Sequence, residues 1–408
     1  MTKAGHESGL PRGWKWWAAN EIMDIRDGTH DSPKYQATGI PLVTSKNLVN
    51  GTIDFSTCQN IAESDHLEIS KRSSVDDGDI LYAMIGTIGN PVVVEKSFEF
   101  SIKNVALFKF NGSEVNNRFF YHFLNTDIVK RQFSANSRGG TQKFVSLGNI
   151  RDLRVPLPPL EEQIRIAAIL DKADAIRRKR QQAIELADQF LKSVFLDMFG
   201  DPVTNPKGWP VKKLSSLSEL INGDRSGNYP SGDEILDDGV VFLNTQNIRN
   251  DELTLKKLAF ISEEKFESLG RGKLARNDIV ITLRGTLGSC CIFDCAYETG
   301  FINAQMMIIR PNKGLDSNYL HSFLKFPSMK SHMRSIGSGS AVPQLTGKQI
   351  QSLEIMIPSD ELCAEFHQIE RLVKQKLLTQ YAKTEDMKLF ESLSSKLFNG
   401  ELTGTGAA

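Results

Sequence analysis

The sequence predicts an α+β protein with two tandem globular domains, each followed by a long helix, and with the two helices paired antiparallel like a coiled coil. Three observations predict this fold. The chain of 408 residues repeats its landmarks at an interval of about 200 residues. Each repeat begins with short β-type runs that are broken by turn residues. Each repeat ends with about 40 residues of helical periodicity.

The repeat is carried by motifs that keep their order and spacing along the chain. Matched pairs are Trp14 with Trp209, Gly39 with Gly239, Asn47 with Asn247, Gly86 with Gly285, and Phe199 with Phe398. Identity between the copies is low, but the landmarks run from end to end. The predicted segments are a first domain (1–155), a central helix (156–200), a second domain (201–358), a C-terminal helix (359–400) and a tail (401–408).

The first part of each copy is rich in short apolar runs separated by Gly, Asn, Asp and Ser. The runs that predict strands cover residues 42–43, 80–82, 92–94 and 105–108 in copy one, and 240–243, 279–281 and 306–309 in copy two. A short helical run follows in each copy, at residues 118–124 and 318–324. Runs of this length with such turn residues are typical of an α+β domain.

The last part of each copy predicts an amphipathic helix. Residues 160–199 contain no Gly or Pro, and at 1.5 Å per residue such a helix is about 60 Å long. The predicted seam residues are Ile166, Leu170, Ile176, Phe190 and Val194 in the first helix, and Phe366, Ile369, Val373, Leu377 and Phe390 in the second. Ser359 is the expected N-cap of the second helix, and Gly200 and Gly400 are the expected C-terminal stops.

Charge and composition exclude some classes of protein. Lys plus Arg and Asp plus Glu both number 49, and hydrophobic residues make up 40% of the chain, which is typical of a globular protein. The balance argues against a polycationic nucleic-acid coat or a membrane-surface peptide, but it leaves room for a local basic groove. Because no segment carries a large positive charge, we expect the chain alone to bind nucleic acid weakly.

No secretory signal and no apolar run long enough to span a bilayer is visible, so a cytoplasmic protein with no membrane association is expected. Five irregularly spaced cysteines fit a reducing compartment. Cys290, Cys291 and Cys295 form the only cluster, and buried structural cysteines are favoured there over a metal site.

Motifs for catalysis are missing. The sequence has no Walker loop, no Gly-x-Gly-x-x-Gly after a strand, no nucleophile elbow and no His-Glu-x-x-His pair. It also lacks an S-adenosylmethionine loop and an Asn/Asp-Pro-Pro-aromatic methyltransferase motif. The Gly-Thr-x-Gly strings at residues 86–89 and 285–288 are best interpreted as tight turns. A protein without its own catalytic site is expected, and no metal ligands are predicted.

The residues at the entry to the first long helix, 155–164, read Val-Pro-Leu-Pro-Pro-Leu-Glu-Glu-Gln-Ile. This string resembles the junction in the specificity (S) subunits of type I restriction-modification enzymes. Gly78-Asp79-Ile80-Leu81 and the Asp-Gly-Thr-His string at 27–30 resemble landmarks of that family's target-recognition domains. The resemblance runs from about Trp14 to Gly400, although copy two departs from it at residues 357–362 and lacks the Asp-Gly-Thr-His string.

The resemblance implies a non-catalytic subunit that reads DNA within a larger complex. The two globular segments are then target-recognition domains, and the two helices are spacers. The partners implied are double-stranded DNA, two methyltransferase (M) subunits and two restriction (R) subunits. The chain itself is expected to bind no cofactor, while S-adenosylmethionine, ATP and Mg²⁺ are used by the partner subunits.

Antiparallel pairing of the two helices would turn the tandem repeat into pseudo-two-fold symmetry, matching the dyad of duplex DNA. Each domain would then read one half of a bipartite target, with half-sites about one helical turn, roughly 10 bp, apart. If the halves read different sequences, matched positions are mainly scaffold, and base-reading residues lie where the copies differ.

Polar residues in divergent loops are therefore the candidate DNA contacts, since Arg and Lys suit guanine while Asn and Gln suit adenine. In copy one they are Thr29, His30, Lys34, Tyr35, Lys46, Arg138, Thr141, Gln142 and Lys143. In copy two they are Arg225, Asn228, Tyr229, Asn244, Gln246, Arg249, Arg284, Ser338, Ser340 and Gln344. Many would touch phosphate only.

Other interpretations remain open. The basic run at 177–180 is either a solvated helix face, which is slightly favoured, or a contact to phosphates or to a partner. A stand-alone enzyme is disfavoured by the missing motifs. The main alternative is a protein-binding adaptor with two globular heads on a helical spacer, and a bipartite DNA footprint would distinguish the two functions.

Overall fold

The structure is a computed structural model that describes residues 10–136, 144–224, 226–337, 344–380 and 385–402. The chain divides into two compact units. Unit 1 holds residues 1–181 and 382–408, and unit 2 holds residues 182–381. The boundary falls inside the long helix α6 (Leu160–Phe199), so each unit contains one half of this helix.

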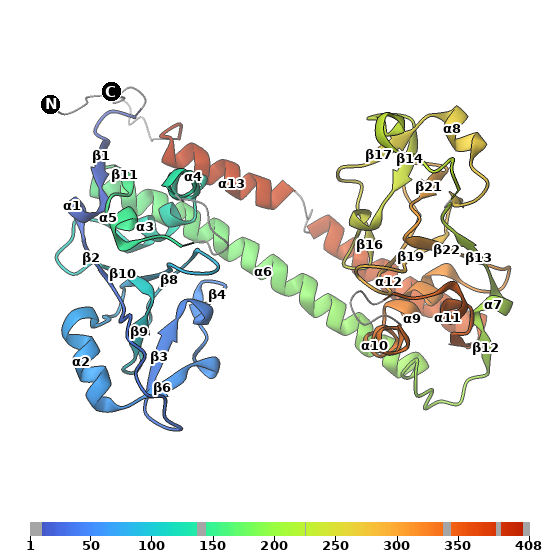
Figure 1. Ribbon diagram of the computed structural model, residues 1–408, viewed down its shortest axis with the longest axis horizontal. Helices are drawn as coiled ribbons and strands as arrows, with labels where there is room; N and C mark the ends of the chain where they lie inside the picture. The colour runs from blue at the N-terminus through green and yellow to red at the C-terminus, as the bar shows by residue number, and fades with distance from the viewer. Residues whose placement is uncertain (1–9, 137–143, 225, 338–343, 381–384, 403–408) are drawn as a thin grey trace. The chain divides into compact units, whose positions relative to one another are not determined.

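Unit 1 is built on two small sheets and two strand pairs (Figure 1). The larger sheet has the antiparallel order β2-β10-β7-β8, and the smaller has the order β6-β3-β9, in which β3 and β9 are parallel. The remaining pairs are β1 with β11 and β4 with β5. The strands are β1 (Lys15–Ala18), β2 (Asp24–Asp27), β3 (Ile40–Thr44), β4 (Leu48–Val49), β5 (Thr52–Ile53), β6 (Gln59–Ile61), β7 (Ile80–Ala83), β8 (Gly89–Val93), β9 (Ser101–Lys103), β10 (Val105–Lys109) and β11 (Arg154–Leu157).

Unit 2 repeats this topology and adds one strand. Its larger sheet has the order β13-β22-β19-β20, and its second sheet has the order β17-β14-β21-β18, in which β14 and β21 are again parallel. The other pairs are β12 with β23 and β15 with β16. The strands are β12 (Val211–Lys213), β13 (Ser218–Asn222), β14 (Val240–Leu243), β15 (Ile248–Arg249), β16 (Glu252–Leu253), β17 (Ala259–Ile261), β18 (Lys273–Leu274), β19 (Ile279–Thr282), β20 (Cys290–Ile292), β21 (Gly300–Ile302), β22 (Met306–Pro311) and β23 (Glu354–Met356).

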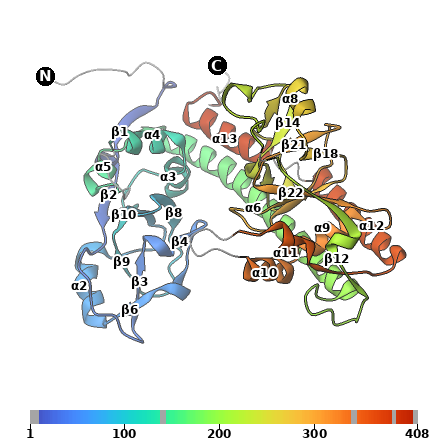
Figure 2. The ribbon, with the colours of Figure 1, turned by 45° about the vertical axis from the view of Figure 1, so that its right-hand side comes forward.

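The helices of the two globular parts also correspond in order. In unit 1, α2 packs beside β9, which Figure 2 shows, and α3 packs on β8. In unit 2, α9 packs on β20 as α3 does on β8. The helices are α1 (Ala19–Ile22), α2 (Glu63–Ser73), α3 (Asn117–Leu124), α4 (Asp127–Asn136), α5 (Leu147–Arg151), α7 (Leu214–Leu217), α8 (Glu263–Ser268), α9 (Ser317–Lys325), α10 (Pro327–Ile336) and α11 (Gly347–Gln351). The short 3-10 turns are η1 (Ser45–Asn47), η2 (Phe55–Thr57), η3 (Gly232–Glu234) and η4 (Thr245–Asn247).

The residues after the second globular part form two helices, α12 (Asp360–Gln380) in unit 2 and α13 (Glu385–Phe398) in unit 1. The Ser359 hydroxyl accepts a hydrogen bond from the Leu362 N–H (3.3 Å), which confirms the predicted N-cap. Gly200 and Gly400 follow α6 and α13 with positive φ angles of 82° and 74°, as expected of C-terminal stops.

The predicted antiparallel pairing is found within each unit. In unit 1, Ile166 and Leu170, near the start of α6, share a buried core with Leu397 and Phe398, at the end of α13. In unit 2, Phe195 near the end of α6 stacks edge-on against Phe366 near the start of α12 (5.5 Å between ring centroids). Burial of these side chains joins each globular part to its helices, because apolar area removed from water is the main stabilising contribution.

None of the helices in the described part of the chain is long and apolar enough to cross a membrane.

Candidate functional site

Unit 1 has a hollow of about 940 Å³ beside the Gly-Thr-x-Gly turn. The turn carries Gly86 with φ +78°, and the Ile88 N–H donates to the Gly86 carbonyl oxygen (3.1 Å). Nothing lies within 4 Å of where a Cβ on Gly86 would be, so the turn is open on this side. Residues from β3, η1, β4, β8 and the neighbouring loops line the hollow, among them Tyr35, Lys46, Thr87, Asn90 and Asn104.

The Asp-Gly-Thr-His string lies beside this hollow and holds a histidine between two oxygen acceptors. The Nδ1 atom of His30 lies 2.9 Å from the Asn104 side-chain oxygen, and its Nε2 atom lies 2.8 Å from a carboxylate oxygen of Asp27. The hydrogen bond to Asn104, followed by that to Asp27, raises the pKa of His30 above its ordinary value. Asp27 is buried, and it also accepts from Arg72 of α2. The exposed imidazole ring is therefore oriented by two hydrogen bonds.

Unit 2 has a second hollow, of about 470 Å³, beside its own Gly-Thr-x-Gly turn. The Leu287 N–H donates to the Gly285 carbonyl oxygen at the same 3.1 Å. Arg271, Arg284, Gln344 and Asn222 are among the side chains that line this hollow. The guanidinium Nε–H of Arg284 donates to the Gln344 side-chain oxygen (2.8 Å).

The two domains share one backbone arrangement at a bridge beside these hollows. In each domain the second residue after a buried strand, β7 or β19, forms an isolated antiparallel bridge with a residue about 60 positions later. The bridges join Ile85 with Phe144 and Arg284 with Gln344. The neighbouring hydrogen bonds also match, because Val145 N–H donates to the carbonyl oxygen of Met84 (3.0 Å) and Leu345 N–H donates to that of Leu283 (2.9 Å). The same bridge thus carries an apolar pair in one domain and a polar pair in the other.

Four matched polar residues, two in each domain, have structural partners. Asp79 is buried and accepts from Lys109 of β10 (2.8 Å), and Asp278 is buried and accepts from Arg310 of β22 (2.8 Å). Asn47 and Asn247 are also buried, and each closes its 3-10 turn. By contrast, the exposed middle residue of that turn is Lys46 in one domain and Gln246 in the other.

The predicted contact residues of domain 1 divide into three groups. Tyr35 and Lys46 line the hollow, His30 lies beside it, and Lys34 is exposed nearby in sequence. Thr29 is partly buried, and its N–H donates to the Ile102 carbonyl oxygen (3.0 Å), so its backbone belongs to the scaffold. Arg138, Thr141, Gln142 and Lys143 lie outside the described residues.

In domain 2 the structure brings Arg284 and Gln344 together and leaves Asn228, Gln246 and Arg249 exposed. Asn244 caps η4 by accepting from the Gln246 N–H (2.8 Å), and Tyr229 packs on Phe242 (5.9 Å between centroids), so both have structural partners. Arg225, Ser338 and Ser340 lie outside the described residues. The polarity criterion missed Ile85 and Phe144, although the duplication would have found them as the counterparts of Arg284 and Gln344.

The predicted helix seam is only partly buried. Ile166, Leu170 and Phe366 are buried, Val194, Ile369, Val373 and Phe390 are half-buried, and Ile176 and Phe190 are 45% and 52% exposed. The side chain of Leu377 lies outside the described residues. Phe195 and Phe199, which the prediction left out, are 1% and 0% exposed. Their aromatic character and i, i+4 spacing were the available signal.

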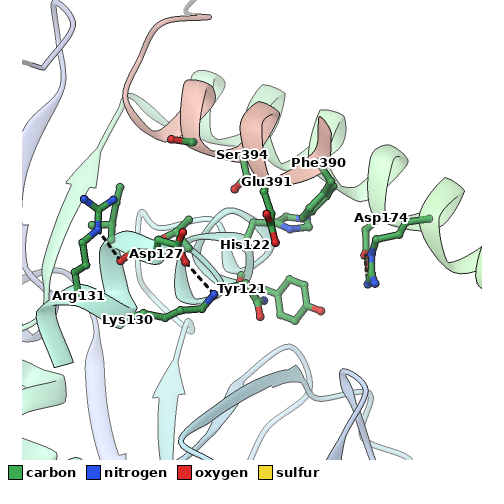
Figure 3. A pocket seen from close by; sticks show the side chains of 14 residues that line it. Tyr121, His122, Asp127, Lys130, Arg131, Asp174, Phe390, Glu391 and Ser394 are labelled. Atoms are coloured by element: carbon green, nitrogen blue, oxygen red, sulfur yellow. Dashed lines mark hydrogen bonds and ion pairs between the residues drawn. The ribbon is translucent and has the colours of Figure 1, made fainter. Parts of the chain in front are cut away.

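A further pocket lies in unit 1 where α3, α4, α6 and α13 meet (Figure 3). Its basic side chains have hydrogen-bond partners. Lys130 donates to the Asp127 carboxylate, Arg131 to the Asp127 backbone carbonyl oxygen, and Arg177 to the Asp174 carboxylate. Arg178 also pairs with Asp174 (2.7 Å), so two members of the basic run have carboxylate partners on their own helix. These contacts give the pocket a structural role in helix packing.

A buried histidine ties α3 to α6 next to this pocket. The Nε2 atom of His122 lies 2.7 Å from Asp171 of α6, which also accepts from Arg118 (2.5 Å). Burial lowers the pKa of His122 against the opposing effect of Asp171. Because an ionised carboxylate can only accept, Nε2–H is the donor in this contact. In unit 2 the corresponding tie joins Lys325 of α9 to the buried Glu370 of α12 (3.2 Å).

The sequence matches the family described as type I restriction modification DNA specificity domain twice, over residues 11–186 and 206–373. The chain belongs to this family, and the resemblance inferred from the motifs is confirmed. Among its relatives are the EcoKI specificity subunit of Escherichia coli K12 (25% identical, covering 97% of this chain and 90% of the relative) and the EcoBI specificity subunit of Escherichia coli (28% identical, covering 71% of this chain and 66% of the relative).

Solved structures share the fold. The S subunit of a type I restriction-modification system from M. genitalium aligns with a TM-score of 0.57 and 17% identity, covering 97% of this chain and 98% of that chain. A chain solved in work on complex assembly and conformational transition of the type I R-M system aligns with a TM-score of 0.50 and 20% identity, covering 96% and 99%. The chain therefore has the two-domain fold of a specificity subunit.

Proposed function

We propose that this chain is the non-catalytic, sequence-specific DNA-recognition subunit of a type I restriction-modification complex. Each globular domain reads one half of a bipartite target in double-stranded DNA. The observation that carries the proposal is that the family matches twice, once on each domain. The two domains share a backbone arrangement at the bridge but carry different side chains on it. Two scaffolds that differ mainly where side chains are exposed are suited to reading two different half-sites.

The partners follow from the family. We propose that two methyltransferase subunits and two restriction subunits assemble with the chain, and that S-adenosylmethionine, ATP and Mg²⁺ are bound by those subunits. Ion pairs and buried aromatic side chains join each domain to its helices. Through these contacts the chain would hold each domain in a fixed position on the helices that the partners bind. Both half-sites would then be presented to one assembled complex.

The charge balance of the two domains limits how much non-specific DNA affinity they can supply to this complex. Residues 1–155 hold 18 basic and 17 acidic side chains, and residues 201–358 hold the same numbers. Non-specific affinity for duplex DNA comes mainly from neutralising phosphates, so the domains alone bring little of it. We therefore propose that the methyltransferase subunits supply most of the phosphate contacts.

The test is a footprint on host DNA, made with the chain alone and with the chain co-purified with its methyltransferase subunits. We expect two short protected segments separated by an unread gap, and only for the assembled complex. An adaptor that grips proteins at both ends would give no sequence-specific footprint. Nanomolar binding by the isolated chain at physiological salt would contradict the division of labour.

A further inference from the structure

The bridge beside the Gly-Thr-x-Gly turn carries a side-chain pair that distinguishes the two domains. Its backbone geometry is the same in both, since the bridge and the neighbouring hydrogen bonds to Met84 and Leu283 coincide. Arg284 and Gln344 line the hollow of domain 2, and Ile85 lines the hollow of domain 1. Both bridges lie next to an open turn. A difference at this position therefore changes what the domain presents without changing how it folds.

In domain 2 the pair consists of an arginine and the glutamine that orients it. Arg284 is exposed, and its Nε–H donates to the Gln344 side-chain oxygen at 2.8 Å. A guanidinium has five N–H donors in a rigid plane, and this contact uses one of them. Within the described part of the chain, the two terminal nitrogens of Arg284 have no protein acceptor. Among the described residues the end of the fork is thus unpaired, and the hydrogen bond to Gln344 restrains its orientation.

A free arginine fork of fixed orientation suits one base. The O6 and N7 atoms of guanine form a pair of acceptors in the major groove, and a bidentate arginine is their commonest specific partner. Adenine presents a donor in place of O6, and neither pyrimidine offers two acceptors. Because Gln344 holds the guanidinium before DNA arrives, less side-chain entropy is lost on binding.

We propose that Arg284 recognises a guanine in the half-site read by domain 2, and that Gln344 is the residue that positions it. The inference rests on the proposed function and deepens it. Domain 1 carries Ile85 and the half-exposed Phe144 at the same bridge, so it has no donor for guanine there. The two half-sites therefore differ at the position that this bridge faces.

The test uses the complex of the full chain with its methyltransferase subunits and a randomised duplex library, from which bound DNA is selected and sequenced. For the wild type, we expect a conserved guanine in one half-site. With Arg284→Ala, that position becomes degenerate and affinity for the selected site falls about five- to 140-fold, while the other half-site is unchanged. Arg284→Lys should lose less affinity and keep part of the preference for guanine, because lysine keeps the charge and can donate to O6 and N7 but lacks the rigid fork.

Gln344→Ala tests the positioning role, since it should weaken the preference for guanine while leaving Arg284 in place. Arg276→Ala is the matched control, because this arginine of the same domain is already paired with Asp294 and Glu298. The control should select the wild-type site. Absence of any selected site for the wild type would refute the proposed function instead of this inference.

Two results would overturn the assignment of Arg284. One is an unchanged half-site in both Arg284 variants. The other is a loss of affinity that is equal on all sequences, with a salt dependence reduced by about one ion, because that pattern is expected of a phosphate contact. Folding of each variant is checked by co-purification with the methyltransferase subunits.

Discussion

Replacing Phe195 by alanine should strongly destabilise unit 2, because this side chain joins the long helix to the second domain. Phe195 is 1% exposed, and its ring packs against those of Phe199, Phe326 and Phe366, with centroids at 4.9, 5.2 and 5.5 Å. Truncating a buried Phe to Ala in such a core costs about 3–5 kcal/mol. With a urea m-value of about 2–3 kcal/mol/M, the midpoint should fall by roughly 1–2.5 M.

The assay is urea unfolding of the full chain followed by fluorescence and circular dichroism. Phe190→Ala is the matched control, since Phe190 lies on the same helix and is 52% exposed. An exposed substitution of this kind changes the free energy of unfolding by less than about 0.5 kcal/mol. Equal losses for the two variants would refute the assignment of Phe195 as the buried anchor.

Three further predictions concern the domains. The pKa of His30, measured by NMR, should lie above the ordinary value of about 6.5 and return toward it in Asp27→Asn. The stability that the His30 contacts contribute should be fully present below about pH 6.5 and be lost as the pH rises through the raised pKa. Gly28→Ala should destabilise domain 1, because its Cβ would lie 2.4 Å from a backbone carbonyl oxygen of β9. Cys290 and Cys291 should resist alkylation at pH 8 in the folded chain, because burial raises the pKa of both thiols, that of Cys290 to about 12.

Each of these predictions has a result that would contradict it. An unshifted His30 would mean that the ring is not held between its two acceptors. For Gly28→Ala, the comparison is Gly112→Ala. A Cβ at Gly112 meets no atom within 4 Å, so this substitution is strained only by its positive φ. A smaller effect at Gly28 than at Gly112 would be contrary to the geometry. Alkylation of Cys290 as fast as in urea would show that the strand is not buried.

The sequence was sufficient to predict the repeat, most strands and the helix ends, because these depend on local pattern. The runs at 80–82 and 279–281 are both strands that pair at the centre of equivalent sheets, β7 and β19. Ser359 and Gly200 also act as caps should. Local propensity, turn residues and apolar periodicity all point the same way at these positions.

Which helix residues are covered could not be predicted from periodicity. Periodicity predicts an apolar stripe on α6 that includes Ile176 and Phe190, yet these side chains are about half exposed. Phe195 and Phe199 are buried instead. Residues at the two ends of α6 pack into the cores of different units, so its apolar stripe need not follow one seam. A seam pattern reports only that a helix has an apolar face, and not what covers it.

The site residues were only partly predictable for a related reason. Arg284 and Gln344 were each expected as DNA contacts, but their hydrogen bond joins residues 60 positions apart and depends on the bridge. The tie between His122 and Asp171 likewise requires α3 to lie against α6. Contacts that depend on tertiary packing of distant segments leave no short-range signal in a single sequence.

The central claim is that each domain reads its own half-site, and exchanging one domain tests it most directly. Residues 206–358 would be replaced by the second domain of a family member with a different target, and adenine methylation would be mapped across host DNA for the assembled complex. The account predicts a new sequence in one half-site, with the other half-site and the gap unchanged. A change in both half-sites, or in neither, would contradict it.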